Sequence, residues 1–381
     1  MQKLRLAALT AVAALVLAAC GGGGSDTTPR AHISSVKVMG DSLADVGTFG
    51  YKFTVQGTAS LTYPERVAQS YGVGALCPYF VATSATTFAP NPAAGCTDYA
   101  IGGGRINNVA APASPVSIPV QLQTASAAAN YSATDLLVVD GGGNDAADLV
   151  GAYLAAQGDG GASFVALVST LVSAGTVNTE LAKGPTGLVE LGGLYMTALA
   201  DKFYDAIKTN ALDKGATHVV VLNMPGITKT PRFQMVLDSI AAANGGGTAG
   251  ATARAQAEAV FDGWIQAFNT ELAAKFSGNA NVVVVDFYTS FKDEIANPAQ
   301  YGLTNATTPA CPVTGTDASG LPSYTFPTCT DAALSAAPPA GQTGTTWWQT
   351  YAFSDSFHPT PYGHQLLGQL ISKSLAAAGW L

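Results

Sequence analysis

The sequence predicts an α/β fold in which a parallel sheet is flanked by helices on both faces. Apolar runs of strand length occur near residues 35–39, 135–140, 217–223 and 281–287. Longer stretches with a helical pattern separate them, near 162–182, 189–214 and 252–276. Strands that alternate with helices along the chain are typical of parallel sheets.

The individual elements follow from local sequence. The first strand is expected to end at Met39, before Gly40, and the second, D-L-L-V-V-D at 135–140, has the continuous apolar character of a buried strand. A last helix is expected at Pro361 to Ala378, because proline at a helix start leaves no N–H unpaired. Residues 72–118 and 299–350 are rich in Thr, Pro, Ala and Gly and are predicted to be irregular insertions, where substrate preference is often set.

The tetrapeptide G-D-S-L, Gly40 to Leu43, directly follows the first predicted strand. A hydroxyl on such a turn projects from the sheet edge, where a nucleophile meets its substrate. Asp41 is expected to support the turn by hydrogen bonds from its side chain to the backbone. Ser42 is therefore the candidate nucleophile.

The motif D-S-F-H-P-T, which begins at Asp355, supplies a base for this serine. The spacing allows Asp355 to accept the Nδ1 proton of His358 and leaves Nε2 free to act as a base. The chain has four histidines. His32 lies in the polar leader, His218 enters a predicted strand and His364 falls in a predicted helix, so His358 is the candidate base.

Two glycine-bearing segments between these motifs are candidates to stabilise an oxyanion. Gly141 to Gly143 follow the second strand and precede Asn144, whose amide can donate to a developing negative charge. The other segment is Y-A-I-G-G-G-R-I-N at 99–107, where a glycine N–H can donate a second hydrogen bond. Two convergent donors would complete a site for acyl transfer.

These four blocks resemble the GDSL or SGNH hydrolase family, which is named for the Ser, Gly, Asn and His of its blocks. The resemblance spans residues 35–376 and implies an SGNH-hydrolase-like three-layer sandwich. It assigns the nucleophile to Ser42, and the acid and the base to Asp355 and His358. It assigns the oxyanion hole to the backbone N–H groups of Ser42 and Gly103 and the side chain of Asn144.

Further features resemble the long secreted branch of the family, which includes autotransporter esterases and plant GDSL lipases. They are the strand at Val283 to Phe287, the pairs Asn297-Pro298 and Tyr301-Gly302, and F-S-D at residues 353–355. The chain departs from the family at Asp98, where members often carry asparagine.

Other ligand sites are weakly supported. Gly141, Gly143 and Ala146 fit the dinucleotide pattern G-x-G-x-x-A, but Asp145 would repel a pyrophosphate there. No P-loop, H-E-x-x-H motif or cysteine–histidine metal cluster is present, so the expected mechanism uses no metal and no cofactor. Arg105 either binds an acidic group of a ligand or is a solvated surface charge, and we favour the second interpretation.

The leader has the features of a bacterial lipoprotein signal. Residues 1–19 combine Lys3 and Arg5 with an apolar stretch too short to span a membrane, and L-A-A-C ends at Cys20 like a lipobox. A lipidated Cys20 would anchor the protein to a membrane through residues 20–34, which have the composition of a flexible tether. Glycine after Cys20 favours the outer membrane or cell surface, by resemblance to Gram-negative lipoproteins. The alternative is a plain cleaved signal and secretion.

The four remaining cysteines are an even number in an export context, which favours disulfides. Their order favours two local pairs, Cys77 with Cys96 and Cys311 with Cys329. Two other pairings of four cysteines remain open at this point.

Composition limits the partners. Only 11% of residues are charged, the formal net charge is -8 and no basic stripe is present, so the sequence predicts no nucleic-acid binding. The first and last site blocks lie at opposite ends of residues 35–381, so this region is expected to form one domain with one active site.

The predicted function is a carboxylic-ester hydrolase that forms an acyl-enzyme on Ser42, and the resemblance to secreted lipases favours hydrophobic acyl esters. The aromatic residues of the insertions fit either an acyl site or a local core: Tyr79, Phe80, Trp347 and Trp348. Acyl transfer to an alcohol or deacetylation of a glycan would use the same site. The alternative from another class is a non-catalytic, lipid-anchored surface binding protein. Loss of Ser42 or His358 would favour it, but both residues are present.

Overall fold

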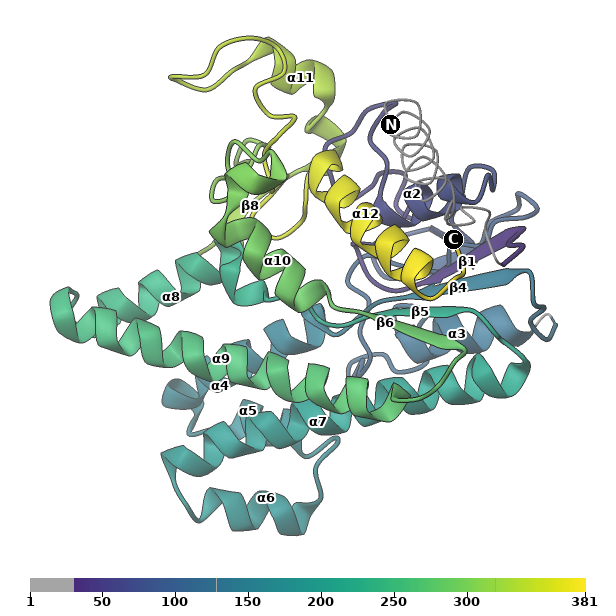
Figure 1. Ribbon diagram of the computed structural model, residues 1–381. Coiled ribbons are helices and arrows are strands. Elements are labelled where there is room, and N and C mark those ends of the chain that lie inside the picture. The colour runs from purple at the N-terminus through teal and green to yellow at the C-terminus, as the bar shows by residue number, and fades with distance from the viewer. Residues whose placement is uncertain (1–30, 128, 319) are drawn as a thin grey trace, which may run out of the picture.

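The computed structural model describes residues 31–127, 129–318 and 320–381. Its centre is a parallel four-stranded sheet in the order β1-β4-β5-β6 (Figure 1). The strands are β1 (Ser35–Met39), β4 (Asp135–Val139), β5 (Val219–Leu222) and β6 (Val282–Val285). Ser35 pairs with Asp135 and Val219 with Val282, so the strands end at a common carboxyl edge.

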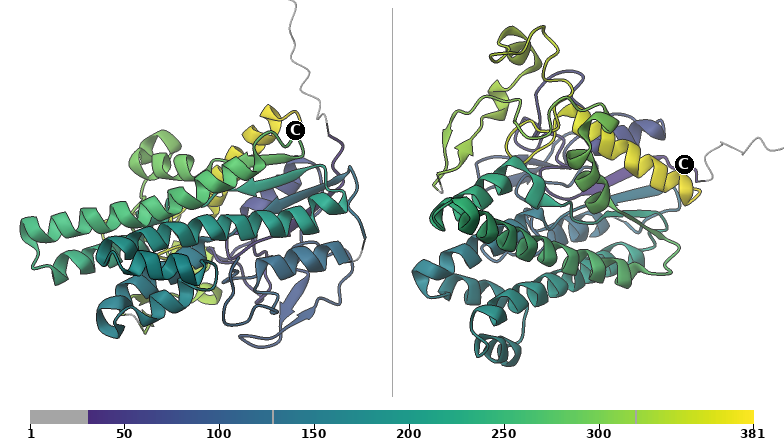
Figure 2. Two further views of the ribbon diagram at one scale, coloured as in Figure 1. Left: turned by 90° about the horizontal axis from the view of Figure 1, so that it is seen from below. Right: turned by 60° about the vertical axis from the view of Figure 1, so that its left-hand side comes forward.

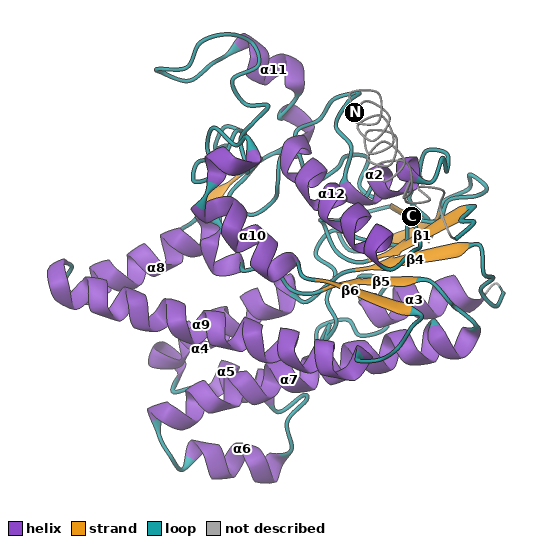
Figure 3. Ribbon diagram, viewed as in Figure 1, coloured by secondary structure: helices purple, strands orange, loops and turns teal. Residues whose placement is uncertain are grey.

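Helices cover both faces of this sheet, as Figure 3 shows by colour. One face packs against α3 (Ile118–Ala127), α7 (Pro185–Asn210) and α9 (Gly247–Phe276), and the other against α2 (Tyr63–Ser70) and α12 (Pro361–Ala377). Alternate side chains of each strand enter opposite clusters, as the pleat of a strand requires. The first cluster receives Met39, Leu137, Val139, Val219 and Val221, and the second Val36, Val38, Leu136, Val138, Val220 and Leu222. The predicted three-layer sandwich is therefore confirmed.

Close packing and helix caps fix the long elements. Gly192 of α7 lies against the Trp264 indole of α9, which leaves no room for a Cβ, and the Trp264 Nε1–H donates to the Val189 carbonyl at 2.8 Å. The start of α12 is capped by Thr360, whose hydroxyl accepts from the Gly363 N–H at 3.2 Å, followed by proline at the first helical position.

Several helices extend beyond the carboxyl edge of the sheet. From that edge, α4 (Gly143–Asp159) and α8 (Pro231–Ala243) run outward, and α9 returns beside α8 (Figures 1 and 2). The short helices α5 (Ala162–Val168) and α6 (Ala174–Leu181) lie beside α4 and α7. None of the helices within the described ranges is both long and apolar enough to cross a membrane.

The sequence missed or misplaced some elements. The helix expected at 162–182 is two helices, because Ser173 caps a new start by accepting from the Thr176 N–H. The strand expected at 281–287 ends at Val285, since Asp286 caps α10 (Phe287–Ala296). Helix α4 was not expected because two glycines precede it and a third, Gly143, is its first residue, and α8 was not expected either. Ala31 and Ile33 are buried in the second cluster, so the packed domain begins before the expected boundary at residue 35.

The insertions contain short hairpins and both disulfides. Strands β2 (Phe80–Ala82) and β3 (Phe88–Pro90) pair antiparallel, as do β7 (Gly315–Thr316) and β8 (Pro322–Ser323). Helix α11 (Asp331–Ala336) and the 3-10 turn at 326–328 lie in the second insertion. The other 3-10 turns span 212–214, 227–229 and 298–301. The structure joins Cys77 to Cys96 and Cys311 to Cys329, which confirms the expected local pairing.

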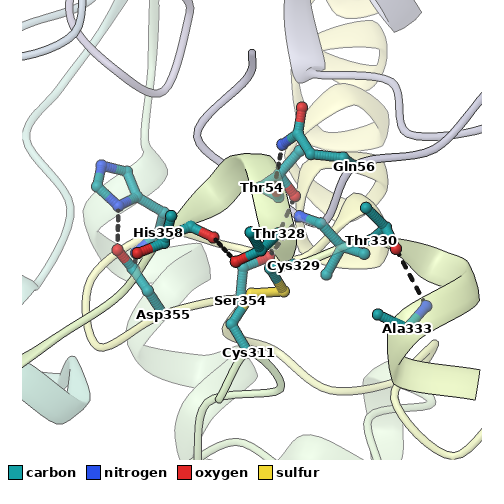
Figure 4. The surroundings of a disulfide bond; sticks show 12 residues. Thr54, Gln56, Cys311, Thr328, Cys329, Thr330, Ala333, Ser354, Asp355 and His358 are labelled. Atoms are coloured by element: carbon teal, nitrogen blue, oxygen red, sulfur yellow. Dashed lines mark hydrogen bonds and ion pairs between the residues drawn. A yellow bond between two sulfur atoms is a disulfide. The ribbon is translucent and has the colours of Figure 1, made fainter. Parts of the chain in front are cut away.

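The disulfide between Cys311 and Cys329 lies beside the segment that carries Asp355 and His358 (Figure 4). The Cys311 N–H donates to the Ser354 carbonyl at 2.7 Å. The Ser354 hydroxyl donates to the Pro359 carbonyl at 2.9 Å. The cross-link therefore fixes a loop that leads directly into the predicted acid and base.

Replacing both cysteines, Cys311→Ser with Cys329→Ser, is expected to lower the free energy of unfolding by about 3 kcal/mol, because the unfolded chain regains the entropy of a loop of this size. Urea unfolding measures the change. The matched comparison is the double variant Cys77→Ser with Cys96→Ser, because its cysteines are 19 residues apart and those of the first variant are 18 apart. An unchanged urea midpoint for the Cys311 and Cys329 variant would contradict this expectation.

Candidate active site

The structure brings together the serine, the histidine and the aspartate that the sequence singled out. The Nε2 of His358 lies 2.7 Å from the Ser42 Oγ, and its Nδ1 lies 2.8 Å from Asp355 Oδ2. Because ionised Asp355 is only an acceptor, the proton of a neutral imidazole belongs on Nδ1, which leaves Nε2 to accept from the Ser42 hydroxyl. The three groups thus form a hydrogen-bonded chain from carboxylate to hydroxyl.

Asp355 is held in its ionised form. Its burial would raise the pKa of the carboxyl group, but the charge of His358 and the hydrogen bonds to the carboxylate outweigh this and lower the pKa. Besides the imidazole, Oδ1 accepts from the backbone N–H groups of Phe357 at 2.8 Å and His358 at 2.5 Å. A charged Asp355 can stabilise an imidazolium on His358.

The turn that carries Ser42 is fixed on both sides of Gly40. The buried Gln121 of α3 accepts from the Gly40 N–H at 2.8 Å and donates to its carbonyl at 3.0 Å. A Cβ on Gly40 would collide with the carboxylate of Asp140, which accepts from the Asp41 N–H at 3.0 Å. Asp41 Oδ1 accepts from the Leu43 N–H at 3.0 Å, as expected of a residue that supports the turn.

The three expected oxyanion donors belong to segments that pack together. In the described part of the chain, neither the Ser42 N–H nor the Gly103 N–H has a hydrogen-bond partner. The Asn144 Nδ2 donates to the Gly104 carbonyl at 3.0 Å, which orients the amide, and it also lies 3.5 Å from Asp41 Oδ2. A Cβ on Gly104 would lie 2.6 Å from the Gly40 carbonyl oxygen, so glycine permits this close approach.

Core packing accounts for the glycines at positions 141 and 142. Both have positive φ angles, 153° and 98°, where glycine is favoured. A Cβ on Gly141 would lie 2.5 Å from Ile118 Cδ1, and one on Gly142 would lie 2.6 Å from Met224 Cε. They are required by core packing rather than by access of a ligand to the backbone.

Arg105 is not a solvated surface charge, contrary to the sequence interpretation. Its guanidinium binds Asp148 through Nε at 2.6 Å and Nη2 at 3.0 Å, and its Nη1 donates to the Gly103 carbonyl at 2.7 Å. This bidentate pair joins the glycine block to α4, the helix that carries Asn144. The neighbour Asp145 accepts from the N–H groups of Ile106 and Asn107 at 3.0 and 2.7 Å, and burial raises its pKa to about 6.

Aromatic rings surround the imidazole of His358. Its ring centroid lies 5.3 Å from that of Phe53, 5.5 Å from Phe326 and 5.6 Å from Phe357. None of these rings was singled out from the sequence, because nothing near Phe53 or Phe326 in the chain marks their contact with a loop so distant in sequence.

The aromatic residues that the sequence left open are local core instead. Trp348 is buried in the cluster around the disulfide between Cys311 and Cys329, and Trp347 packs against that cluster. Tyr79 stacks on Tyr99, and the Phe80 ring meets Tyr99 edge to face.

The remaining buried histidine is not placed to act as a base. His364 of α12 accepts from the Tyr63 N–H through Nδ1 at 3.3 Å. Its burial lowers the pKa to about 3, so the ring is neutral. Across residues 31–127, 129–318 and 320–381, no cluster of three or more His, Cys, Asp or Glu is arranged to hold a metal ion. Cys20, most of the expected tether and the signal lie outside the described residues.

A small apolar cavity lies behind the nucleophile turn, between α10, α12 and the carboxyl edge of the sheet. Its lining includes Leu43, Phe291, Phe353 and Phe357. Glu294 of α10 also faces it, and its Oε1 accepts from the Ser290 hydroxyl at 3.0 Å. Burial raises the pKa of Glu294 to about 7.

Comparison with known proteins finds similarity to a family of ester hydrolases. Residues 187–371 match the family described as GDSL-like Lipase/Acylhydrolase. This part of the chain is therefore similar to the GDSL lipase/acylhydrolase family. The matched range contains Asp355 and His358, whereas Ser42, Gly103 and Asn144 precede it.

The chain is also similar in sequence to a curated relative, and a solved structure shows a weaker likeness. Lipase 1 from Photorhabdus luminescens is 26% identical over 371 residues, covering 90% of this chain. The chain spans 50% of the length of that protein. The extracellular lipase from Streptomyces rimosus covers 91% of this chain and 99% of its own, with 17% identity and a TM-score of 0.36. The site described above therefore rests on the contacts of this chain itself.

Glu294→Gln is expected to make the protein relatively more stable as the pH rises. In the folded parent the pKa of Glu294 lies above its value of about 4.3 in the unfolded chain. The protonated Glu294 therefore contributes its full stability below about pH 4.3, and this contribution is lost as the pH rises through about 7. Glutamine keeps an acceptor for Ser290 and cannot ionise. We expect the free energy of unfolding of the variant, relative to the parent, to increase by about 2–3 kcal/mol between pH 5 and pH 8.

Denaturant unfolding at several pH values measures this difference. Glu271→Gln, on the surface of α9, is the matched control and should show no comparable trend. A difference for Glu294→Gln that stays constant with pH would contradict the assigned ionisation.

Proposed function

We propose that this protein is a serine-dependent carboxylic-ester hydrolase that works through an acyl-enzyme on Ser42. The hydrogen-bonded chain from Asp355 through His358 to Ser42 carries this proposal. The match of residues 187–371 to a family of lipases and acylhydrolases, and the similarity to a protein named Lipase 1, support the reaction class.

The proposed reaction begins when the Ser42 Oγ attacks the ester carbonyl carbon and its proton passes to His358 Nε2. The carbonyl oxygen becomes an oxyanion, to which the N–H groups of Ser42 and Gly103 and the Asn144 amide would donate. The imidazolium then gives its proton to the leaving alcohol as the C–O bond breaks. Water attacks the acyl-enzyme in the same way, with His358 as the base, and releases the acid and the free serine.

The environment of His358 favours hydrophobic esters. The rings of Phe53, Phe326 and Phe357 surround the base, where a leaving alcohol must receive its proton. Such a site binds apolar groups more readily than charged ones.

The proposal is tested by hydrolysis of p-nitrophenyl esters from acetate to palmitate, with Ser42→Ala, His358→Ala and Asp355→Asn compared with the parent. We expect Ser42-dependent turnover, which Asp355→Asn lowers by about 10³- to 10⁴-fold because the imidazolium loses its charged partner. A fluorophosphonate probe should label the parent and not Ser42→Ala. Undiminished turnover by Ser42→Ala, or a folded parent that neither labels nor hydrolyses any ester, would contradict the proposed function.

We also propose that the exported protein is anchored to the outer membrane through a lipidated Cys20, on the basis of L-A-A-C at the end of the leader and the tether that follows. The parent expressed in bacteria should incorporate an alkyne-labelled fatty acid and fractionate with membranes. Cys20→Ser should abolish the label. Secretion of an unlabelled parent protein would instead support a plain cleaved signal.

A further inference from the structure

A long groove runs between α4 and the hairpin formed by α8 and α9. Its volume is about 820 Å³. On one side it is lined by Ala147, Gly151 and Leu154 of α4, and on the other by Phe233, Val236 and Ile240 of α8. These helices project together from the carboxyl edge of the sheet (Figures 1 and 2). The groove therefore leads away from the edge at which the candidate active site lies.

One end of the groove adjoins the proposed catalytic groups. Asn144, Ala147, Gly151 and Leu154 follow one another at spacings of three and four residues, which places them on one face of α4. Across the groove, the Phe233 ring stacks on that of Phe357 with centroids 6.3 Å apart. Phe357 directly precedes His358. A chain attached to a carbonyl carbon beside Ser42 can thus pass between the first turn of α4 and Phe233.

The groove is suited to an uncharged hydrocarbon. Leu154 is 37% exposed, one of only four large hydrophobic side chains so exposed among the described residues. The one charged residue of the lining, Arg232, is paired with Asp317 at 3.3 Å. Uncharged polar side chains also line the groove, namely Gln157, Ser239, Asn244 and Gln256. An acyl chain would cover the apolar part of the lining and leave no charge without a partner.

Size distinguishes the groove from the cavity behind the nucleophile turn. That cavity has a volume of about 60 Å³, against about 820 Å³ for the groove. It is also lined by the carboxylate-bearing Asp41, Asp140 and Glu294. An extended chain longer than a few carbons therefore fits the groove and not the cavity.

We propose that the groove between α4 and the α8–α9 hairpin binds the acyl chain of the substrate and selects long-chain esters. From Ala147 to Gln157 the groove follows α4 for ten residues, or about 15 Å. An extended chain advances about 1.2 Å per bond, so the groove accommodates about twelve bonds of an acyl chain. This inference rests on the proposed function, because it takes the ester carbonyl to lie at Ser42.

The inference is tested by filling the groove at Gly151. A Cβ there would have no atom within 4 Å, so Gly151→Phe places a ring in the groove without displacing the helices. Gly263 of α9 is equally open and does not line the groove, and Gly263→Phe is the matched control. The full chain is used for both variants, with p-nitrophenyl laurate and butyrate as substrates.

We expect kcat/KM of the parent to rise with acyl length by roughly two- to fourfold per buried methylene. Gly151→Phe should lower kcat/KM for laurate at least tenfold while that for butyrate changes less than twofold, and Gly263→Phe should preserve the parent's ratio. A ratio of laurate to butyrate that is the same in Gly151→Phe and the parent would overturn the groove assignment.

A binding measurement separates this inference from the proposed function. In the Ser42→Ala background, a fluorescent eleven-carbon fatty acid should bind, and adding Gly151→Phe should weaken its binding at least tenfold. Such binding would support the groove whether or not the parent hydrolyses esters. Equal binding with and without Gly151→Phe would overturn the groove, even if Ser42-dependent hydrolysis is observed.

Discussion

The arrangement of the site depends on how closely the chain packs at Gly40. The carboxylate of Asp140, at the end of the neighbouring strand, occupies the space that any side chain at Gly40 would need. The buried Gln121 satisfies both backbone groups of Gly40 at the same time. A buried backbone group without a partner is costly, so this turn has little freedom to adopt another conformation. The restricted backbone limits the positions that the Ser42 hydroxyl can adopt. A group that attacks a bound substrate must be held in such a defined position.

Around this turn, buried carboxylates act as acceptors for backbone N–H groups of separate segments. Asp45 accepts from Gly47, Thr48 and Gly102, and Asp98 accepts from Val46 and Ala100. Burial, and then the charge of Asp45, raise the pKa of Asp98 well above its usual value. Family members often carry asparagine at this position, but an amide offers only one acceptor oxygen where Asp98 uses both. The departure noted in the sequence therefore belongs to the scaffold of the glycine block.

The parts of the fold and site that could be predicted are those encoded in short stretches of sequence. The strands at 35–39 and 135–139, the G-D-S-L turn and the D-x-x-H pair each combine a local pattern with a known geometry. Gln121, Arg105 and Phe53 act through partners 81, 43 and 305 residues away respectively, and nothing local marks them. Helix α4 was missed because the glycines that precede it, which are required by contacts with Ile118 and Met224, resemble a loop. Side chains whose partners are set by tertiary packing thus escaped sequence reasoning.

The separation of Ser42 and His358 by 316 residues affects when the chain acquires a complete site. Ser42 is made early in synthesis, whereas the loop of Asp355 and His358 precedes only the last helix. Contacts such as that of Thr54 with Ser354 must close across almost the whole chain before the imidazole reaches the serine. A nascent or truncated chain therefore carries an unactivated hydroxyl. The hydrogen bond between His358 and Ser42 therefore forms only after the C-terminal part of the chain has been made and has folded onto the first strand and its turn.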